Sequence, residues 1–221
     1  MRTIRRWRSP AAFAIFFAGL ALAHATDVGL PPPSGPIAPR VAPVLGDDGL
    51  YHQSWFLLSF LDLRQDFRDA QDAGKRLAVL FEQRGCSYCA DLHTKVLARK
   101  YINDYVRQNF AMLQLDLWGA REVTDFDGAV MKAWAERWGI SFSPTFVFFK
   151  GELTGVDGKW GRELEAVERL ALSFGHDTFY DLFVWVRQKV YERDGNFQRF
   201  HIARSAERAA MKADAERAGS N

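Results

Sequence analysis

The stretch Leu77-Ala78-Val79-Leu80-Phe81 is followed closely by Gly85-Cys86-Ser87-Tyr88-Cys89. Five consecutive apolar residues predict a buried strand, and apolar residues at helical spacing after the cysteines predict a helix. The chain of 221 residues has only two cysteines, and they lie three positions apart where the strand passes into the helix. We expect the rest of the chain to fold around this unit.

The expected position of Cys86 favours a reactive thiolate. A helix N-terminus offers unpaired backbone N–H groups and the positive end of the helix dipole. A free thiol titrates near about 8.5, whereas a CxxC thiol at a helix N-terminus can titrate at roughly 3.5–7.5. We therefore expect Cys86 to be a nucleophile and Cys89, one turn further on, to be the resolving thiol.

A CxxC pair alone is compatible with redox, zinc or haem chemistry. Haem attachment requires a histidine directly after the second cysteine, and this position is Ala90. A structural zinc site needs four nitrogen or sulfur ligands. His93 supplies a third ligand, but no second cluster of histidine or cysteine follows. We interpret His93 as a solvated helix residue and expect the cysteine pair to be redox-active rather than structural or metal-binding.

Pro144 gives a second marker for redox chemistry. It lies at the threshold of the apolar strand predicted over residues 145–149, where it cannot donate to a ladder and can occupy a cis turn beside a site. Together, the CxxC pair and this proline resemble the thioredoxin superfamily. The resemblance implies an α/β thioredoxin-like fold, with a central mixed sheet flanked by helices. It also implies that a cis Pro144 faces the cysteines, with Ser143 beside it.

The first 25 residues are a predicted secretory signal peptide. Four arginines precede an apolar run over residues 11–23, and Ala23-His24-Ala25 is an A-x-A cleavage site. The run is short for a bilayer span, although an uncleaved segment would leave a membrane tether. Cleavage removes four arginines and no acidic residue, so the net charge changes from +2 to −2 and gives no support to nucleic-acid binding. We expect the mature protein in the periplasm.

Composition divides the remainder of the chain into three parts. Residues 26–49 contain six prolines, which predicts an extended, passive linker. Residues 50–200 are expected to form the thioredoxin-like domain, with the apolar residues of segment 51–60 buried in it. Residues 201–221 are rich in alanine, arginine and glutamate, and we expect a helix-prone but exposed C-terminal tail.

Local patterns predict the elements of the domain. Asp62 is the expected cap of a helix that ends at Gly74. The helix after the cysteines is expected to continue beyond a break. Residues 162–170 have helical spacing, but a thioredoxin-like sheet requires another antiparallel strand there, so we expect a strand. The other predictions are a parallel strand over 110–117, a helix over 128–138, and a helix from Asp177 to about Arg193.

A narrower resemblance rests on two segments. The acidic loop Asp116–Gly128 lacks the ligand spacing of a calcium loop, so we interpret it as a solvated rim. Together with the pattern E-Q-x-G-C-x-Y-C over residues 82–89, this loop resembles the SoxW-type thioredoxins, which are exported proteins of bacterial sulfur-oxidation systems. The resemblance covers residues 55–205.

This resemblance implies a thiol–disulfide oxidoreductase that acts as a reductase. It would receive electrons from a membrane thiol transporter and reduce a periplasmic protein or small-molecule disulfide, with the Cys86–Cys89 disulfide and no other cofactor. Ser143 and Tyr88 would contact the substrate. Cytosolic thioredoxins carry a buried Asp at the position of Leu80. Glu82 is either a proton acceptor on the same strand face or a surface carboxylate.

Four alternatives to a reductase remain open from the sequence, among them a disulfide isomerase and an interaction module whose Cys86–Cys89 bridge does not turn over. The residues between the cysteines do not fix the direction of electron flow, so a DsbA-like oxidant fits the same motif. A copper or zinc carrier with a thioredoxin fold, using Cys86, Cys89 and His93 as ligands, is the rival from a different functional class.

Overall fold

A computed structural model describes residues 29–132, 134–149, 166–171 and 175–220 of the chain. The predicted signal peptide, residues 1–25, lies outside these residues, and so do residues 162–165 at the start of the predicted late strand.

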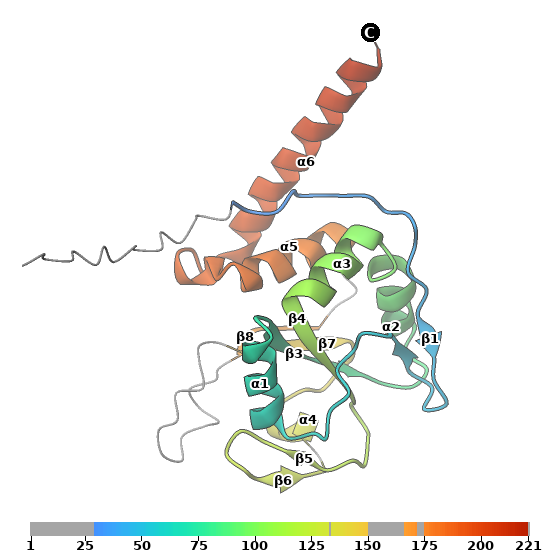
Figure 1. Ribbon diagram of the computed structural model, residues 1–221, viewed down its shortest axis with the longest axis vertical. Coiled ribbons are helices and arrows are strands. Elements are labelled where there is room, and N and C mark those ends of the chain that lie inside the picture. The colour runs from blue at the N-terminus through green and yellow to red at the C-terminus, as the bar shows by residue number, and fades with distance from the viewer. Residues whose placement is uncertain (1–28, 133, 150–165, 172–174, 221) are drawn as a thin grey trace, which may run out of the picture.

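A four-stranded mixed sheet forms the centre of the described structure (Figure 1). Its order is β4–β3–β7–β8, with β3 parallel to β4 and antiparallel to β7, and β7 antiparallel to β8. This sheet confirms the predicted fold class and the late strand at residues 166–171. The strands are β3 (Arg76–Glu82), β4 (Phe110–Asp116), β7 (Thr145–Phe149) and β8 (Ala166–Ala171).

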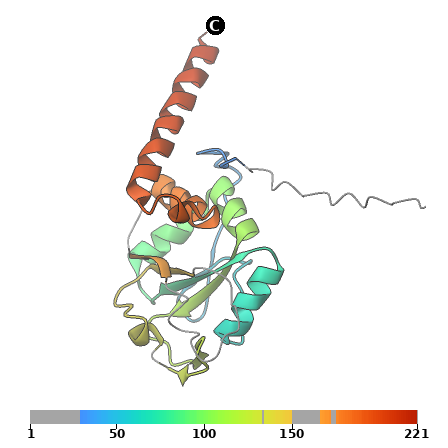
Figure 2. The ribbon, with the colours of Figure 1, turned by 90° about the vertical axis from the view of Figure 1, so that its left-hand side faces the viewer.

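Helices cover both faces of the sheet (Figures 1 and 2). One face carries α1 (Leu63–Asp72) and the short α4 (Trp134–Arg137). The other face carries α2 (Ser87–Asp91), the π-helix η1 (Leu92–Val96), α3 (Lys100–Asn109) and α5 (His176–Arg187). The predicted break after the cysteines lies between η1 and α3, where Arg99 has an extended backbone (φ −75°, ψ 125°).

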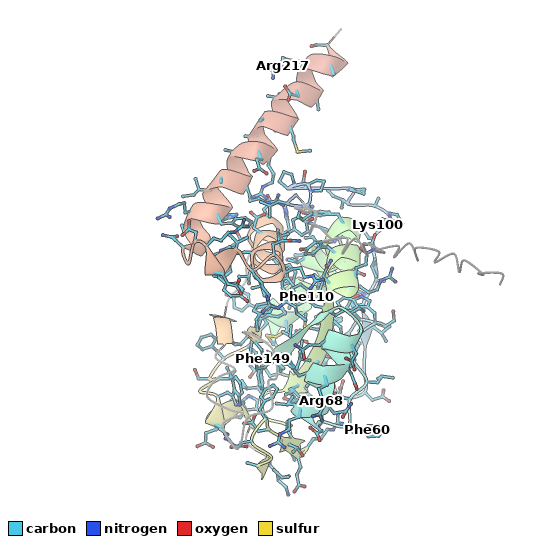
Figure 3. All side chains as sticks on the ribbon, turned by 60° about the vertical axis from the view of Figure 1, so that its left-hand side comes forward. Phe60, Arg68, Lys100, Phe110, Phe149 and Arg217 are labelled. Atoms are coloured by element: carbon cyan, nitrogen blue, oxygen red, sulfur yellow. A yellow bond between two sulfur atoms is a disulfide. The ribbon has the colours of Figure 1, made fainter. Side chains whose placement is uncertain are left out.

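The sheet separates two apolar cores. Successive side chains of β3 alternate between them, because a strand points its side chains to opposite faces. Val79 and Phe81 pack toward α1, whereas Ala78 and Leu80 pack toward the α3 and α5 side. Figure 3 shows Phe110 and Phe149 within this body. The same alternation puts Glu82, the last residue of β3, on the face that carries α2 and η1.

Helix α1 begins and ends as the sequence predicted. The Asp62 side chain caps it by accepting hydrogen bonds from the backbone N–H groups of Arg64 (3.0 Å) and Gln65 (3.2 Å). Just after the helix, Gly74 adopts a positive φ of 67°, the conformation typical of a residue that follows a helix C-terminus.

Asp66 in the first turn of α1 supports a prediction about pH and stability. Burial raises the pKa of its carboxyl group, although Ser59 donates a hydrogen bond to it. When folding raises the pKa of a carboxyl group, the folded state binds its proton more tightly than the unfolded state does. The stability of the fold therefore falls as the pH rises from the unfolded pKa to the folded pKa. We expect Asp66→Asn to raise the melting temperature at pH 7 and to have no such effect below about pH 3.

Thermal unfolding followed by circular dichroism across this pH range checks the prediction. Asp69→Asn, at an exposed position of the same helix, is the control. A melting temperature that falls at pH 7, or a difference that persists unchanged in acid, would contradict the role assigned to the buried charge.

The predicted helix over residues 128–138 is confirmed only in part, by the short α4 (Trp134–Arg137), and its predicted start at Gly128 is wrong. Residues 123–131 instead form an antiparallel hairpin of β5 (Val123–Thr124) and β6 (Val130–Met131). Gly128 has a φ of +84°, which a turn uses and a helix start does not. The interpretation of the Asp116–Gly128 loop as a solvated rim is also wrong at Asp125, which is buried and accepts a hydrogen bond from Trp138 Nε1 (3.1 Å).

The proline-rich segment is not a passive linker. The backbone N–H of Val41 donates to the Ala98 carbonyl (2.9 Å), and the Ile37 carbonyl accepts from the N–H of Lys100 (3.1 Å). The segment ends in a small hairpin, β1 (Val44–Leu45) and β2 (Tyr51–His52). Residues 31–41 therefore pack along the domain as a strap.

Two further expectations fail near the ends of elements. Leu58 and Phe60 are 97% and 105% exposed, so segment 51–60 is not buried throughout, and Phe60 lies at the periphery in Figure 3. The N-cap of α5 is Gly175 rather than Asp177, and the helix stops at Arg187 because Lys189 adopts a left-handed conformation. A short 3-10 helix, η2 (Val190–Glu192), follows.

The C-terminal residues form one long helix, α6 (Phe197–Gly219), whose distal part projects from the domain (Figure 1). Most of its side chains are exposed, as predicted, but Arg204 is only 1% exposed. Within the described ranges, no helix is long and apolar enough to cross a bilayer.

Candidate active site

Cys86 lies at the junction of β3 and α2, where the sequence placed it. It is the N-cap of α2, and its sulfur accepts a hydrogen bond from the backbone N–H of Cys89 (3.1 Å). The two cysteines form a disulfide with Cα atoms 5.2 Å apart. Cys86 is partly exposed, whereas Cys89 is 5% exposed. An incoming sulfur therefore has access to Cys86 first.

The pairing of β7 with β3 brings Pro144 beside the cysteines. Thr145, the first residue of β7, pairs with Phe81 of β3. The Ser143–Pro144 peptide is cis, and the Ser143 carbonyl oxygen lies 3.7 Å from Cys86 Sγ. The Ser143 hydroxyl is buried and has no hydrogen-bond partner within the described residues.

Glu82 is not a surface carboxylate. Glu82 is 1% exposed, and its side chain accepts hydrogen bonds from His93 Nε2 (3.0 Å) and from Gln114 Nε2. All three side chains lie on the sheet face that α2 and η1 cover. Of the two sequence interpretations of Glu82, only the buried carboxylate agrees with the structure.

The interpretation of His93 as a solvated residue is wrong. His93 is 0% exposed, because η1 turns the imidazole toward Glu82 and under the rings of Tyr51 and Phe56. The ring is therefore bonded to Glu82 rather than grouped with the cysteines as a ligand set. Among the residues that the structure describes, no group of three or more histidine, cysteine or acidic side chains is arranged to hold a metal ion.

The buried carboxylate and the disulfide share one cavity of about 360 Å³. Glu82, Cys86 and Cys89 all line it, and Leu50 and Tyr51 from the β1–β2 hairpin complete its wall. A cavity of this size has room for water molecules. It therefore provides a route for a proton between the sulfur of Cys89 and the Glu82 carboxylate.

Exposed aromatic side chains surround the site. Tyr88, Phe142 and Trp118 are each more than half exposed. Trp118 Nε1 donates a hydrogen bond to the Gln83 side chain (2.7 Å), which fixes the indole near the end of β3. These side chains give the opening at Cys86 an apolar border.

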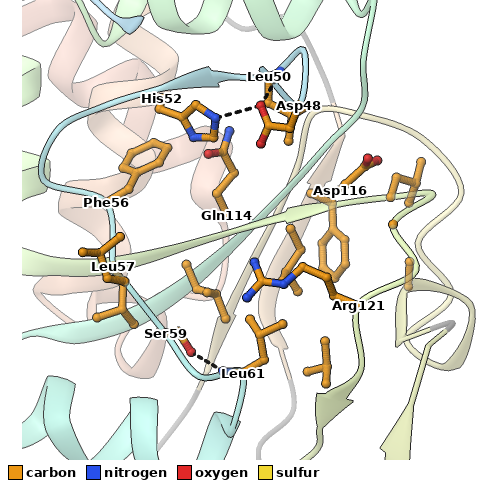
Figure 4. Close-up of a pocket in the computed structure, with 18 of the residues that line it drawn as sticks. Asp48, Leu50, His52, Phe56, Leu57, Ser59, Leu61, Gln114, Asp116 and Arg121 are labelled. Atoms are coloured by element: carbon orange, nitrogen blue, oxygen red, sulfur yellow. Dashed lines mark hydrogen bonds and ion pairs between the residues drawn. The ribbon is translucent and has the colours of Figure 1, made fainter. Parts of the chain in front are cut away.

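A larger cavity of about 680 Å³ lies elsewhere, between segment 48–61 and the end of β4 (Figure 4). Its wall includes Leu61, Leu115 and Arg121. None of the predicted site residues lines it. The Cys86–Cys89 disulfide therefore lies at the smaller cavity.

Sequence reasoning missed the polar residues that surround Glu82 and His93. Gln114 carried a signal, because it is a polar residue within an apolar strand and its side chain must find partners when the strand is buried. Gln53 and Asn103, which are also buried, lie in segments whose pattern gave no such indication.

Comparison with known proteins agrees with the sheet topology. Residues 63–163 match a family described as the thioredoxin-like domain. No curated protein matches the chain. The chain has a thioredoxin-like fold, with a cysteine pair bonded as a disulfide at the position described above.

Solved structures to which the chain is similar include a thioredoxin-fold protein from Helicobacter pylori and a thioredoxin from Thermus thermophilus. The first is 16% identical with a TM-score of 0.43, over 65% of this chain and 94% of that one. The second is 22% identical with a TM-score of 0.41, over 57% of this chain and 82% of that one.

Proposed function

We propose that this protein is an exported thiol–disulfide oxidoreductase that reduces disulfides of periplasmic proteins or small molecules. The observation that carries the proposal is the Cys86–Cys89 disulfide at the N-terminus of α2, with the accessible sulfur against the Ser143 carbonyl. A helix N-terminus stabilises a thiolate at Cys86 once the disulfide is reduced.

The reaction begins with the reduced protein. The Cys86 thiolate attacks one sulfur of the substrate, the substrate S–S bond breaks, and the departing thiolate takes a proton from solvent. Cys89 then gives its proton to Glu82 and attacks Cys86 Sγ. The mixed disulfide breaks, the second substrate thiolate leaves and is protonated, and two electrons have passed from the dithiol to the substrate. The Cys86–Cys89 disulfide remains and must be reduced again.

Substrate contacts follow from the arrangement around Cys86. Backbone groups at Ser143 lie next to the reactive sulfur and are positioned to pair with an extended segment of the substrate. Tyr88 is exposed two residues after Cys86 and offers an apolar contact. We assign both residues to substrate binding, and we assign Pro144 to the turn that holds Ser143 there.

Export and electron supply are inferred from the sequence. An arginine-rich start, an apolar run and an A-x-A site support a periplasmic location, with a membrane tether if cleavage fails. In an oxidising compartment a reductase needs a source of electrons, so we assign a membrane thiol transporter as the donor. The SoxW-like loop favours a cysteine-bearing partner in sulfur oxidation.

The reduction potential of the purified protein, equilibrated against a thiol buffer, tests this proposal. We expect a value near about −270 mV, which is typical of a reducing thioredoxin. A value near about −120 mV would establish an oxidant of exported proteins instead. A cysteine pair that does not equilibrate with the buffer would rule out a redox function.

A further inference from the structure

A chain of buried polar side chains leads from the surface of the domain to Glu82. Trp55 Nε1 bonds to Asn103 Oδ1 (3.1 Å), and Asn103 Nδ2 bonds to Gln53 Oε1 (3.1 Å). Gln53 Nε2 then lies 3.4 Å from His93 Nδ1, and His93 Nε2 lies 3.0 Å from Glu82. Buried polar groups that are bonded in series hold one another in a single arrangement.

The first member of the chain determines the orientation of the next two. The indole N–H of Trp55 can only donate, so the Asn103 atom that faces it is the oxygen. The Asn103 amide nitrogen therefore points the other way, where it donates to the Leu97 carbonyl (2.9 Å) and to the oxygen of Gln53. The remaining Gln53 atom, its amide nitrogen, then faces His93.

This orientation determines the tautomer of His93. The Gln53 amide nitrogen is a donor, so His93 Nδ1 must accept and carries no proton. The imidazole is therefore neutral, with its single proton on Nε2, and that proton points to the Glu82 carboxylate. Gln114 Nε2 donates to the same carboxylate and to the Tyr51 carbonyl (2.8 Å).

Glu82 is thereby fixed as the acceptor of hydrogen bonds from His93 and Gln114, and no cation among the described residues is seen to bond to it. It lies in the wall of the cavity that contains the two cysteines, and it is the only carboxylate among the residues that line this cavity. The titratable groups that face the Glu82–His93 pair from neighbouring elements are Tyr51, Cys86 and Cys89. A carboxylate held in this way is oriented to receive a proton from Cys89.

We propose that His93 is a positioning residue for the resolving step. Its Nε2–H holds the Glu82 carboxylate toward the dithiol cavity, and the Trp55–Asn103–Gln53 chain fixes the tautomer that makes this possible. The inference rests on the proposed redox function and adds the residue that controls proton transfer from Cys89. Loss of the Nε2 donor removes one of the two hydrogen bonds that hold the Glu82 carboxylate toward the cavity.

The two sulfur steps are separable in a stopped-flow experiment with excess reduced protein and dithiobis(nitrobenzoate). Attack by Cys86 releases a first coloured thiolate, and resolution by Cys89 releases the second in a concentration-independent phase. We expect His93→Leu to slow the second phase at least about tenfold at pH 7 and to leave the first phase within about twofold. We expect the deficit to close as the pH rises, because a Cys89 thiol that is already ionised needs no proton acceptor.

Three further variants keep the test decisive. His93→Gln retains an N–H donor, and we expect it to recover most of the rate of the second phase. Glu82→Gln removes the proton acceptor, so we expect a slow second phase that the additional substitution His93→Leu does not slow further. Lys95→Leu, at an exposed position of the same helix, is the matched control. Three results in His93→Leu would each overturn the proposal: an unchanged rate of the second phase, equal slowing of both phases, or a deficit that persists at high pH. Absence of the first phase in the unmodified protein would instead overturn the redox function itself.

Discussion

Cys86→Ser is expected to lower the rate of disulfide reduction by at least about a thousandfold, because the hydroxyl that replaces the thiol is not ionised and cannot attack a disulfide sulfur. Cys89→Ser has a different expected result. It retains the exposed nucleophile, so each molecule attacks one substrate and then stops as a mixed disulfide at Cys86. The difference in exposure between the two sulfurs is the reason for this asymmetry.

Turnover of a protein disulfide with a thiol donor, followed by mass spectrometry of the trapped species, measures both outcomes. Ser87→Ala, an exposed substitution between the cysteines, controls for disturbance of the turn. If Cys89→Ser were the fully inactive variant and Cys86→Ser formed the trapped adduct, the assignment of nucleophile and resolving thiol would be reversed.

Much of this site could be predicted because its signals are local. An apolar run, a CxxC pair and a helical pattern follow one another between Leu77 and Leu97, and each limits the position of the next. The prediction for Pro144 used the same logic at the start of an apolar strand. These patterns place Cys86 at a helix N-terminus without knowledge of any distant contact.

The environment of Glu82 could not be predicted in this way. Burial of His93 depends on Tyr51, Gln53 and Phe56, which are distant from it in sequence and contact the ring only in the folded structure. A histidine on a helix between charged neighbours fits a solvated face equally well when only the sequence is considered. Tertiary contacts decided between the two.

The wrong helix start predicted at residues 128–131 has a similar cause. Apolar residues at helical spacing favoured a helix there, but a hairpin turn at Gly128 and the bond between Asp125 and Trp138 stabilise a different backbone path. Local propensity is weak compared with burial of a large aromatic side chain and a paired carboxylate.

A second buried carboxylate, Asp181, ties the C-terminal helix to the domain. It is fully buried on α5 and accepts hydrogen bonds from three cationic or protonatable side chains of α6: His201 Nδ1 (2.7 Å), Arg204 Nε (3.2 Å) and Arg208 Nη2 (2.7 Å). The hydrogen bond to Asp181 raises the pKa of Arg208. Arg204 also donates to the carbonyls of Pro31 (2.6 Å) and Pro32 (3.1 Å), so the cluster holds the strap as well.

We expect Asp181→Ala to lower the free energy of unfolding by about 3–5 kcal/mol, because it removes the buried carboxylate that pairs with Arg204 and leaves only the half-exposed Glu207 as its ionic partner. Urea denaturation measures the loss, and hydrogen exchange in α6 and residues 31–41 shows whether both are released together. Replacing Asp181, Arg204 and Arg208 together with apolar residues is expected to recover much of the stability, since no buried charge is then left alone.

Asp214→Ala supplies the matched control on the same helix. It removes an ion pair with Arg217 in which both side chains are more than two-thirds exposed. Screening by solvent leaves such a pair worth about 0–1 kcal/mol. A cost for Asp181→Ala no larger than that of the control would contradict the cluster as the anchor of α6. A large loss of unfolding free energy with unchanged hydrogen exchange in α6 would show that Asp181 stabilises α5 alone. The comparison therefore separates anchoring of α6 from local packing around α5.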